Sequence, residues 1–371
     1  MVKQKKSLSI FLASIMLLFG LLLAGCSDEE TGTDDGNNTE DNESTNDSTG
    51  ETDSGTSTLA TVTDRGTLIL GGNNQLPGFG YVNEDGEYEG FDIDFGKAIA
   101  AAVLGDAEAL EVRPLSADER FTALQTGEVD VLIRNTTWTT TRDTDLGTNF
   151  GPTTFYDGQG IMVRADSGIE TVQDLAGATI GVETGTTTEL NLADQFRKLG
   201  IEYTQQVFDD ADSLVAAYEA GSVDAWTTDK SGLASRKTTL SDPSAHKILT
   251  ETLSKEPLGP DVREGDDQWF DIVQWVTFAT MEGEELGINS ENVDDFLDSE
   301  DPVVRRLLGV EGGLGTMLGI PDDFAYQVIK QVGNYEEIFN RHLGPDTIFG
   351  LERGVNELWT NGGVLYSPPF R

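Results

Sequence analysis

Two arginines that lie close together in the sequence could bind an anion. Arg134 and Arg142 flank a run of Asn, Thr and Trp residues, and the hydroxyl groups of Thr137 and Thr139 lie shortly before the second arginine. A guanidinium presents a planar set of N–H donors that matches the two oxygens of a carboxylate. In an acidic chain, however, most arginines form surface ion pairs. Residue type alone therefore leaves a ligand site and a surface ion pair both open.

The segment Gly185-Thr-Thr-Thr-Glu189 predicts a helix N-terminus that could also face an anion. Thr186 and Glu189 have the spacing of a capping box, in which each side chain accepts a hydrogen bond from the other residue's backbone. The first N–H groups of a helix have no partner within the helix, and the helix dipole favours negative charge there. Plain capping by Thr186 explains the same residues, and the two interpretations are compatible.

Asp229 could bind a cation such as an ammonium group. It follows the strand-like segment 223–227 and precedes a helical pattern. A carboxylate and an ammonium form charge-assisted hydrogen bonds. An Asp in this position is more often a turn residue, because its side chain hydrogen-bonds the nearby backbone. Sequence position alone favours the turn.

Few residues suit enzymatic catalysis. The two histidines, His246 and His342, lie in polar, irregular or late segments, and Cys26 is the single cysteine. We find no His, Cys and acid cluster with metal-ligand spacing, and no Gly-x-Ser-x-Gly motif. We therefore expect no catalytic residue, no cofactor and no metal, although carboxylates in a cleft could still act as acid or base.

The elements that must position these residues alternate between strand and helix patterns, which predicts an α/β fold. In the first half we expect strands at 66–71, 111–115 and 129–133, a hairpin at 81–91, and helices at 94–104 and 120–126. The second half repeats this order, with strands at 177–182, 203–208 and 223–227 and helices at 186–200 and 213–220.

One short pattern occurs in both halves. The segments Leu124–Asp130 and Tyr218–Asp224 share the pattern Φ-x-x-Gly-x-Val-Asp, where Φ is an apolar residue and x is any residue. Each segment leads into a predicted strand. The alignment places Asn135 opposite Asp229, each just past the carboxyl end of its strand. Ligands of open α/β sheets bind outside the carboxyl ends of the strands. We therefore expect both residues to line one cleft between two facing halves.

The composition is strongly acidic. The 371 residues carry 24 Lys and Arg against 66 Asp and Glu, a formal net charge of −42, which argues against nucleic acid as a partner. Without residues 1–26 and 27–57, 55 acidic and 21 basic residues remain, a charge of −34. Such a surface repels itself in dilute salt. We expect a halophilic, salt-adapted protein, and an ordinary acidic secreted protein is the alternative.

The N-terminal 26 residues have the pattern of an export signal. Three lysines precede the short apolar segment 10–23, which ends in Leu23-Ala-Gly-Cys26, similar to a bacterial lipobox. We expect a signal peptide at 1–26, lipidation at Cys26 and attachment to the extracytoplasmic face of the membrane. An uncleaved anchor with an incidental Cys is the alternative. Residues 27–58, almost wholly polar and acidic, predict a disordered tether.

Several stretches together carry a family resemblance: Leu76–Phe79, Gly90–Phe95, Glu119–Gln125, Arg134–Arg142, Tyr156–Gly160, Thr184–Leu190, Asp229, Ser254–Pro260 and Gly265–Phe270. They resemble the polar amino-acid-binding proteins of ABC importers, the family-3 extracytoplasmic solute receptors, and are most similar to the general L-amino-acid-binding subgroup. The resemblance spans about residues 59–371 and is specific as a set.

The resemblance implies a two-lobe, periplasmic-binding-protein-like (type II) α/β fold with two hinge crossovers, near 153–160 and 252–260. Lobe 1 would be discontinuous, formed by 59–155 and a return at 257–371 that ends in a helical extension, and lobe 2 would be 156–256. A helix at 267–281 would pack in lobe 1, with Phe270, Val273, Trp275 and Phe278 in or against its core.

The resemblance also implies roles at the site. Arg142 would bind the carboxylate of an L-amino acid, with Arg134 as the rival arginine, and Asp229 would bind its ammonium. Thr186 and Thr187 would present the helix N-terminus, with a direct hydroxyl contact from Thr187. Further ligand-binding residues would be Asn135, Thr137, Gln75 and Trp138, the last two at the side-chain pocket.

The function so implied is a monomeric binding lipoprotein that closes on an amino acid and delivers it to the permease of an ABC importer. The first alternative is an enzyme on the same fold, similar to cyclohexadienyl dehydratase. The second is a sensory ligand-binding domain, which would need a membrane span and a further module. Neither feature follows the domain before Arg371, so we expect a transport receptor.

Overall fold

The structure, a computed structural model, describes residues 57–371. The predicted signal peptide, Cys26 and residues 27–56 of the predicted tether lie outside the described residues. Helix α1 (Thr58–Arg65) begins one residue before the expected start of the fold. The N–H of Thr58 donates to the carboxylate of Asp266 at 2.7 Å, so the first helix is anchored to a distant part of the chain.

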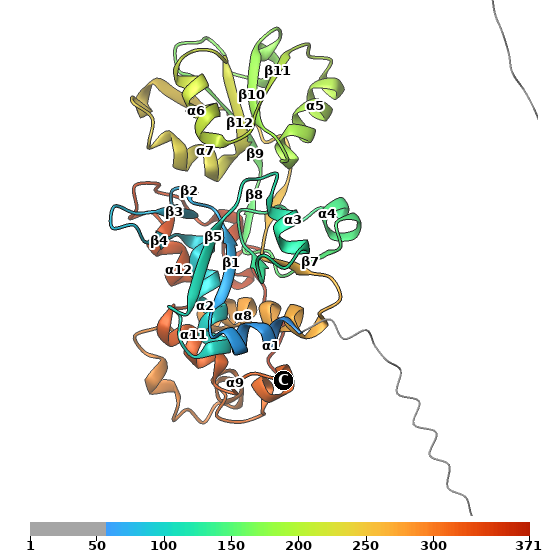
Figure 1. Ribbon diagram of the computed structural model, residues 1–371. Coiled ribbons are helices and arrows are strands. Elements are labelled where there is room, and N and C mark those ends of the chain that lie inside the picture. The colour runs from blue at the N-terminus through green and yellow to red at the C-terminus, as the bar shows by residue number, and fades with distance from the viewer. Residues whose placement is uncertain (1–56) are drawn as a thin grey trace, which may run out of the picture. The chain divides into compact units, whose positions relative to one another are not determined.

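The first lobe is built on a five-stranded sheet (Figure 1). Its strands lie in the order β5 (Leu110–Pro114), β1 (Leu68–Gly72), β6 (Val131–Leu132), β15 (Asp261–Arg263) and β7 (Thr148–Phe150). β5, β1 and β6 are parallel, whereas β15 runs antiparallel between β6 and β7. Because β15 enters from a part of the chain beyond residue 260, this lobe is discontinuous.

Helix α2 (Phe91–Leu104) packs against β1 and is buried along most of its length. It begins three residues earlier than the helical pattern predicts, because Phe91 and Ile93 are buried together with Phe95. Gly90 makes this start possible, since its φ is 139° and a Cβ there would lie 2.3 Å from the carbonyl oxygen of Phe79. The predicted hairpin is present as β3 (Gly80–Val82) and β4 (Tyr88–Glu89), and β2 (Gln75–Leu76) pairs with β3.

The second lobe has its own five-stranded sheet. Its strands lie in the order β11 (Thr204–Phe208), β10 (Thr179–Glu183), β12 (Ala225–Asp229), β9 (Gln159–Arg164) and β13 (His246–Ile248). Helices α5 (Thr187–Leu199), α6 (Ala211–Glu219) and α7 (Lys230–Lys237) pack against its strands. Separate apolar clusters, one with α5 and one with α6 and α7, bury different sets of residues from these strands.

The repeated Val-Asp pattern makes the same contacts in both lobes. The carboxylate of Asp130 accepts from the N–H of Ile69 at 2.7 Å, and that of Asp224 accepts from the N–H of Thr179 at the same distance. Both Asp residues also donate their N–H to the carbonyl of the same partner residue. Each Asp therefore fixes the register of its strand against the first parallel strand of its lobe, and the predicted internal repeat is confirmed.

Two antiparallel strands, β8 (Phe155–Asp157) and β14 (Glu256–Leu258), connect the two sheets (Figure 1). They coincide with the two predicted crossovers. The two-lobe α/β fold class with a discontinuous first lobe is confirmed.

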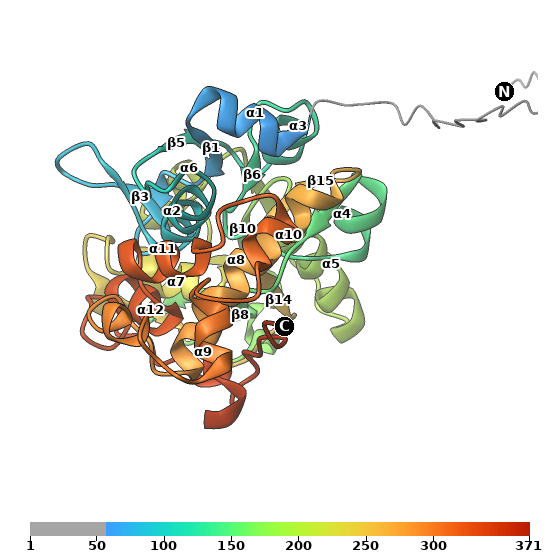
Figure 2. The ribbon, with the colours of Figure 1, turned by 90° about the horizontal axis from the view of Figure 1, so that it is seen from below.

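The chain after β15 packs on the first lobe. Helix α8 (Asp267–Glu285) extends four residues beyond its predicted end; Val273 is buried, and Phe270, Trp275 and Phe278 pack against the core. Helices α10 (Leu314–Leu318), α11 (Phe324–Gln331) and α12 (Tyr335–His342) contact α8 (Figure 2). The remaining helices are α3 (Arg120–Gln125), α4 (Thr140–Asp145), α9 (Pro302–Leu307) and the 3₁₀ turns at Val172–Leu175, Pro243–Ala245, Val293–Phe296, Gly354–Asn356 and Trp359–Asn361.

An aromatic cluster joins this C-terminal part to the hinge. Phe155 of β8 packs edge-on against Phe79 and Phe91 and stacks on Phe339 of α12. The hydroxyl of Tyr335 donates to the carbonyl of Thr154 at 2.7 Å. Within residues 57–371, no helix combines the length and apolar character that crossing a membrane requires.

Candidate ligand-binding cleft

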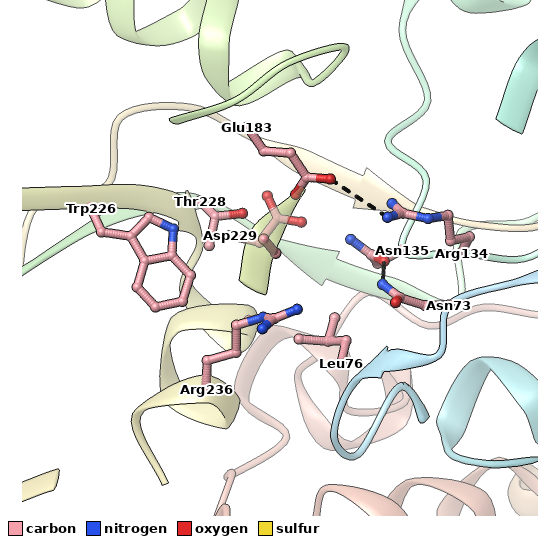
Figure 3. A pocket seen from close by; sticks show the side chains of 11 residues that line it. Asn73, Leu76, Arg134, Asn135, Glu183, Trp226, Thr228, Asp229 and Arg236 are labelled. Atoms are coloured by element: carbon pink, nitrogen blue, oxygen red, sulfur yellow. Dashed lines mark hydrogen bonds and ion pairs between the residues drawn. The ribbon is translucent and has the colours of Figure 1, made fainter. Parts of the chain in front are cut away.

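A cavity lies where the carboxyl ends of strands from both lobes meet (Figure 3). Asn135 and Asp229 both line it, as the alignment of the two halves predicts. The other lining residues are Asn73, Leu76, Arg134, Glu183, Ala211, Trp226, Thr228, Gly232 and Arg236. The cavity is therefore bounded by both lobes and carries charged groups of both signs.

Strand ends place most of these polar groups. Asn73 follows β1, Arg134 and Asn135 follow β6, Glu183 ends β10, and Asp229 ends β12. In each lobe these strands run parallel, so their carboxyl ends share one edge of the sheet. The site is thus at the position where open α/β sheets bind ligands.

Asn135 is held in a strained conformation by its neighbours. Its φ is 36°, the one positive value at a non-glycine residue among those described. Its N–H donates to Oδ2 of Asp92 at 2.6 Å, and its Oδ1 accepts from Nδ2 of Asn73 at 3.1 Å. Burial raises the pKa of Asp92 to about 7, although the N–H of Asn135 and the charge of Arg134 act in the opposite direction. Strain of this kind gathers at functional sites, where the surroundings fix an unusual geometry.

Asp229 carries a buried carboxylate with no hydrogen-bond partner among residues 57–371, and it does not cap α7. The turn role that sequence position favours is therefore not what this side chain does. Burial raises its pKa well above the usual range; Asp157 and Glu256 raise it further, whereas Arg120 and Arg142 lower it. A cation would remove the cost of ionising such a group.

The neighbouring carboxylates belong to the hinge strands. Asp157 and Glu256 lie directly opposite each other in the β8–β14 pair. Asp157 accepts from the N–H of Gly158 at 2.7 Å and from the N–H of Ser231 at 3.1 Å. Burial raises the pKa of Asp157 to about 6, and these hydrogen bonds oppose the shift. The carboxylate of Asp229 is thus next to the two strands that connect the lobes.

Arg142 is buried at the junction of the lobes. Thr139 caps α4 by accepting from the N–H of Arg142 at 3.3 Å. Nη1 of Arg142 donates to the carbonyl of Thr137 at 2.8 Å, and Nη2 donates to the carbonyl of Gly185 at 3.4 Å. Burial lowers the pKa of Arg142 to about 10, opposed by Glu256 and Asp229, so the guanidinium stays charged at neutral pH.

A second cavity contains the helix N-terminus. Arg142, Thr186 and Thr187 line it, together with Ala117, Asp118, Phe121, Thr139, Thr141, Leu146, Gly185, Glu189, Leu190, Asn191 and Asp194. Thr186 caps α5 by accepting from the N–H of Glu189 at 3.2 Å. The hydroxyl of Thr187 donates to Glu256 at 2.8 Å and lies 3.5 Å from the hydroxyl of Thr137.

The structure thus brings six predicted residues to the junction of the lobes, in two groups. Asn135 and Asp229 line the first cavity, and Thr137, Arg142, Thr186 and Thr187 lie at or beside the second.

Gln75 and Trp138 lie outside the residues that line either cavity. Gln75 is in β2, next to Leu76 of the first cavity, and its N–H donates to Oδ1 of Asn73. Trp138 stacks on Phe150 and is 44% exposed.

Sequence reasoning missed Asn73, Glu183, Trp226 and Arg236. Asn73 and Glu183 could have been found, because each lies at the carboxyl end of a predicted parallel strand. Arg236 lies in the last turn of α7, where a basic residue is expected simply to complement the helix dipole. No cluster of His, Cys and acidic residues within 57–371 could hold a metal ion.

Comparison with known proteins extends over most of the chain. A profile of the bacterial extracellular solute-binding proteins, family 3, matches residues 68–288. The chain is 50% identical over 317 residues to the general L-amino acid-binding periplasmic protein AapJ of Rhizobium johnstonii, covering 85% of this chain and 93% of that protein. It is 49% identical over the same length to the glutamate/glutamine/aspartate/asparagine-binding protein BztA of Rhodobacter capsulatus, covering 85% and 94%.

A solved structure is also similar. A periplasmic binding protein of an ABC transporter from Brucella ovis, with glutathione bound, matches with a TM-score of 0.83 and 46% identity. The match covers 85% of this chain and 99% of that structure.

Proposed function

Because the chain belongs to family 3 of the bacterial extracellular solute-binding proteins, we propose that it captures L-amino acids outside the cytoplasm and delivers them to an ABC importer. Two relatives at about half identity, AapJ and BztA, are named for the binding of amino acids. This proposal requires one site that recognises both ends of a zwitterion.

The observation that carries the proposal is that Asp229 and Arg142 lie near enough at the junction of the lobes for the charge of each to shift the pKa of the other. Asp229 offers a buried carboxylate without a hydrogen-bond partner among the described residues, which suits an ammonium. Arg142 offers a buried, charged guanidinium beside the N-terminus of α5, and both groups suit a carboxylate. Asn135, Thr137, Thr186 and Thr187 add hydrogen-bonding groups around them.

Binding is coupled to closure of the lobes. Arg142 belongs to the first lobe, whereas Asp229 and Thr187 belong to the second, so one ligand bridges both. Only the closed arrangement makes both sets of contacts, and the ligand therefore favours that arrangement over the open one. The β8–β14 pair is the hinge, and the closed form is the one that the permease recognises.

We propose further that the protein is a monomeric lipoprotein, anchored through Cys26 to the extracytoplasmic face of the membrane. The lipobox-like sequence before this single cysteine supports the anchor. We also propose that the protein binds without catalysing a reaction, in keeping with relatives that are named as binding proteins.

Isothermal titration of the soluble domain against the twenty amino acids tests this function, with sugars and peptides in the same screen. Wild type should bind several amino acids, whereas Arg142→Ala and Asp229→Ala should each lose measurable binding. Each hydrogen bond to a charged group contributes about 1.5–3 kcal/mol, roughly tenfold or more in affinity, and each variant removes an ion pair together with its hydrogen bonds.

Arg197→Ala is the matched control, because it removes an arginine from an exposed ion pair on α5 and Arg197 lines neither cavity. Near-native titrations of the Arg142 and Asp229 variants would exclude their assigned roles. Conversion of a bound amino acid into a product, followed by mass spectrometry, would show an enzyme instead.

A further inference from the structure

Two arginines from opposite lobes face the cavity that contains Asp229. Arg134 comes from the first lobe and Arg236 from α7 of the second, and their residues are 6% and 7% exposed. Both side chains extend toward the same space in Figure 3. Neither is the arginine assigned to the α-carboxylate, so the cavity has anion-binding capacity that the proposed function does not use.

The hydrogen-bond donors of the two arginines are only partly satisfied. Nε of Arg134 donates to the carbonyl of Leu115 at 2.7 Å, but Nη2 lies 3.7 Å from Oε1 of Glu183, too far for a hydrogen bond. Nη1 of Arg236 donates to Asp212 at 3.0 Å, and its Nε and Nη2 have no partner among residues 57–371. Both residues line the cavity, so these free N–H groups can donate to an acceptor that a ligand brings there, and a hydrogen bond to a charged group is a strong one.

The two guanidiniums also repel each other. Burial lowers the pKa of Arg134, Glu183 opposes that shift, and the charge of Arg236 lowers the pKa further. An anion between them would pair with both and relieve the repulsion, whereas a cationic side chain would increase it. Glu183 is the competing anion on the protein, but its distance from Arg134 makes it a weak partner.

We propose that Arg134 and Arg236 form a side-chain subsite for a second carboxylate, so that the favoured ligands are α-amino dicarboxylic acids such as glutamate and aspartate. This inference rests on the proposed function, because Arg142 and Asp229 must first hold the α-carboxylate and the ammonium. Leu76 and Trp226 line the same cavity and offer apolar surface to the methylene groups of the ligand.

The order of affinities follows from the charges. The side-chain carboxylate of glutamate can form ion pairs with both Arg134 and Arg236. The side chain of glutamine has an acceptor oxygen but no charge. The side chain of leucine leaves the N–H donors of both arginines without a partner. Lysine adds a third positive charge to the cavity. We expect glutamate to bind most tightly of the four, glutamine next, leucine more weakly, and lysine most weakly.

Isothermal titration of Arg236→Gln against glutamate and leucine tests the subsite. Glutamate affinity should fall by about tenfold or more, since a charge-assisted hydrogen bond is lost, while leucine affinity changes less than about threefold. The near-constant leucine affinity would also show that the variant folds and closes.

Asp212→Asn is the matched control, because it breaks the same surface ion pair but leaves the guanidinium in place. It should keep the wild-type preference for glutamate. If Arg236→Gln lost equal affinity for glutamate and for leucine, the proposed subsite would be wrong and the role of Arg236 would be structural. Wild type that binds leucine as tightly as glutamate would also overturn it, whereas wild type that binds no amino acid would overturn the proposed function itself.

Discussion

At the scale of the residue, the cleft contains charged groups whose burial destabilises the folded protein. Asp229 is buried beside Asp157 and Glu256, and no hydrogen bond from the described residues stabilises its carboxylate. The positive charges that lower its pKa are those of Arg120 and Arg142. We therefore expect ionised Asp229 to destabilise the ligand-free protein and, in the proposed function, to stabilise the complex by pairing with the ligand ammonium.

Replacing the Asp229 carboxylate should raise the stability of the ligand-free protein while it abolishes amino-acid binding. The pKa of Asp229 is raised in the folded protein, so its contribution to stability is present below the usual pKa of an Asp and is lost as pH rises toward the raised value. Asp229→Asn removes the cost of ionisation. At pH 8 the free energy of unfolding of the ligand-free variant should exceed that of wild type by about 1 kcal/mol or more. This difference should vanish near pH 4, where Asp229 of the wild type is protonated.

Thermal melts of both proteins across this pH range measure the effect, and titration with amino acids should show that the variant has lost binding. Asp64→Asn, at an exposed position of α1, serves as the control. A variant that is destabilised at pH 8 would mean that the carboxylate has a structural role in the ligand-free fold.

The sequence predicted part of this site and could not predict the rest. The positions of Asn135 and Asp229 could be predicted by aligning the two short repeats, because segments with the same sequence pattern occupy equivalent places in the two similar sheets. Arg236 could not be predicted, since it faces the cavity from the end of a helix with ordinary basic residues. Asp157 and Glu256 are neighbours only through strand register, which depends on residues about 100 positions apart.

At the scale of the element, helix α5 shows how a local motif determines the contact between the lobes. Thr186 caps the helix as predicted, but the reciprocal half of the capping box is not formed, since the Glu189 carboxylate accepts from Nε2 of Gln205 instead. The preceding Gly185 has a φ of 68°. Its carbonyl accepts from Arg142 of the other lobe. A Cβ at Gly185 would lie 3.0 Å from Cα of Asp118, also in the other lobe. Glycine is therefore required both by the turn and by the approach of the lobes.

Gly185→Ala should weaken ligand binding more than it weakens folding. The methyl group would contact the backbone of Asp118, which cannot move aside as a flexible side chain can, and so would oppose the close approach of the lobes. We expect amino-acid affinity to fall by about tenfold, in addition to a loss of about 1 kcal/mol of stability from the strained φ.

Titration calorimetry and thermal melts of Gly185→Ala measure the two effects. Gly200→Ala at the other end of α5 is the matched control, because it has a similar φ of 69° but no atom within 4 Å of the added Cβ. It should lose stability and keep its affinity. Equal affinities for the two variants would contradict a role for Gly185 in closure.

Most elements could be predicted because their burial is periodic and their ends carry Gly or capping residues. The strand and helix order of both halves agrees with the structure, including the Gly-x-Val-Asp units whose Asp residues fix strand register. The first and last residues of an element were less predictable where contacts with distant parts of the chain determine them. Helix α2 begins early because the backbone at Gly90 turns against Phe79, a contact that the helical pattern does not encode.

At the scale of the whole molecule, the C-terminal part supports the hinge from a distance in sequence. Tyr335 and Phe339 of α12 pack against the aromatic cluster that contains Phe155, and the hydroxyl of Tyr335 bonds the backbone just before β8. The family profile ends at residue 288, before this helix. The sequence alone indicated a helical extension but not its contact with the hinge.

The net charge sets the response of the molecule to salt. The formal charge is −42 for the chain and −34 without residues 1–57. Repulsion among exposed carboxylates is screened over about 10 Å at 0.1 M salt and about 3 Å at 1 M. We therefore expect the melting temperature to rise with NaCl well above physiological concentration, by about 2–4 °C for each kcal/mol of repulsion that is relieved.

Melts of the soluble domain from about 0.1 to 2 M NaCl measure this response, with an equally concentrated sugar series to separate screening from exclusion of cosolute. The gain should shrink near pH 4, where exposed carboxylates become protonated and lose the charge that salt screens. Because the cleft is buried, salt should change the affinity for amino acids less than it changes stability. A melting temperature that stays flat above about 0.15 M would identify an ordinary acidic protein whose charges are already accommodated by its fold.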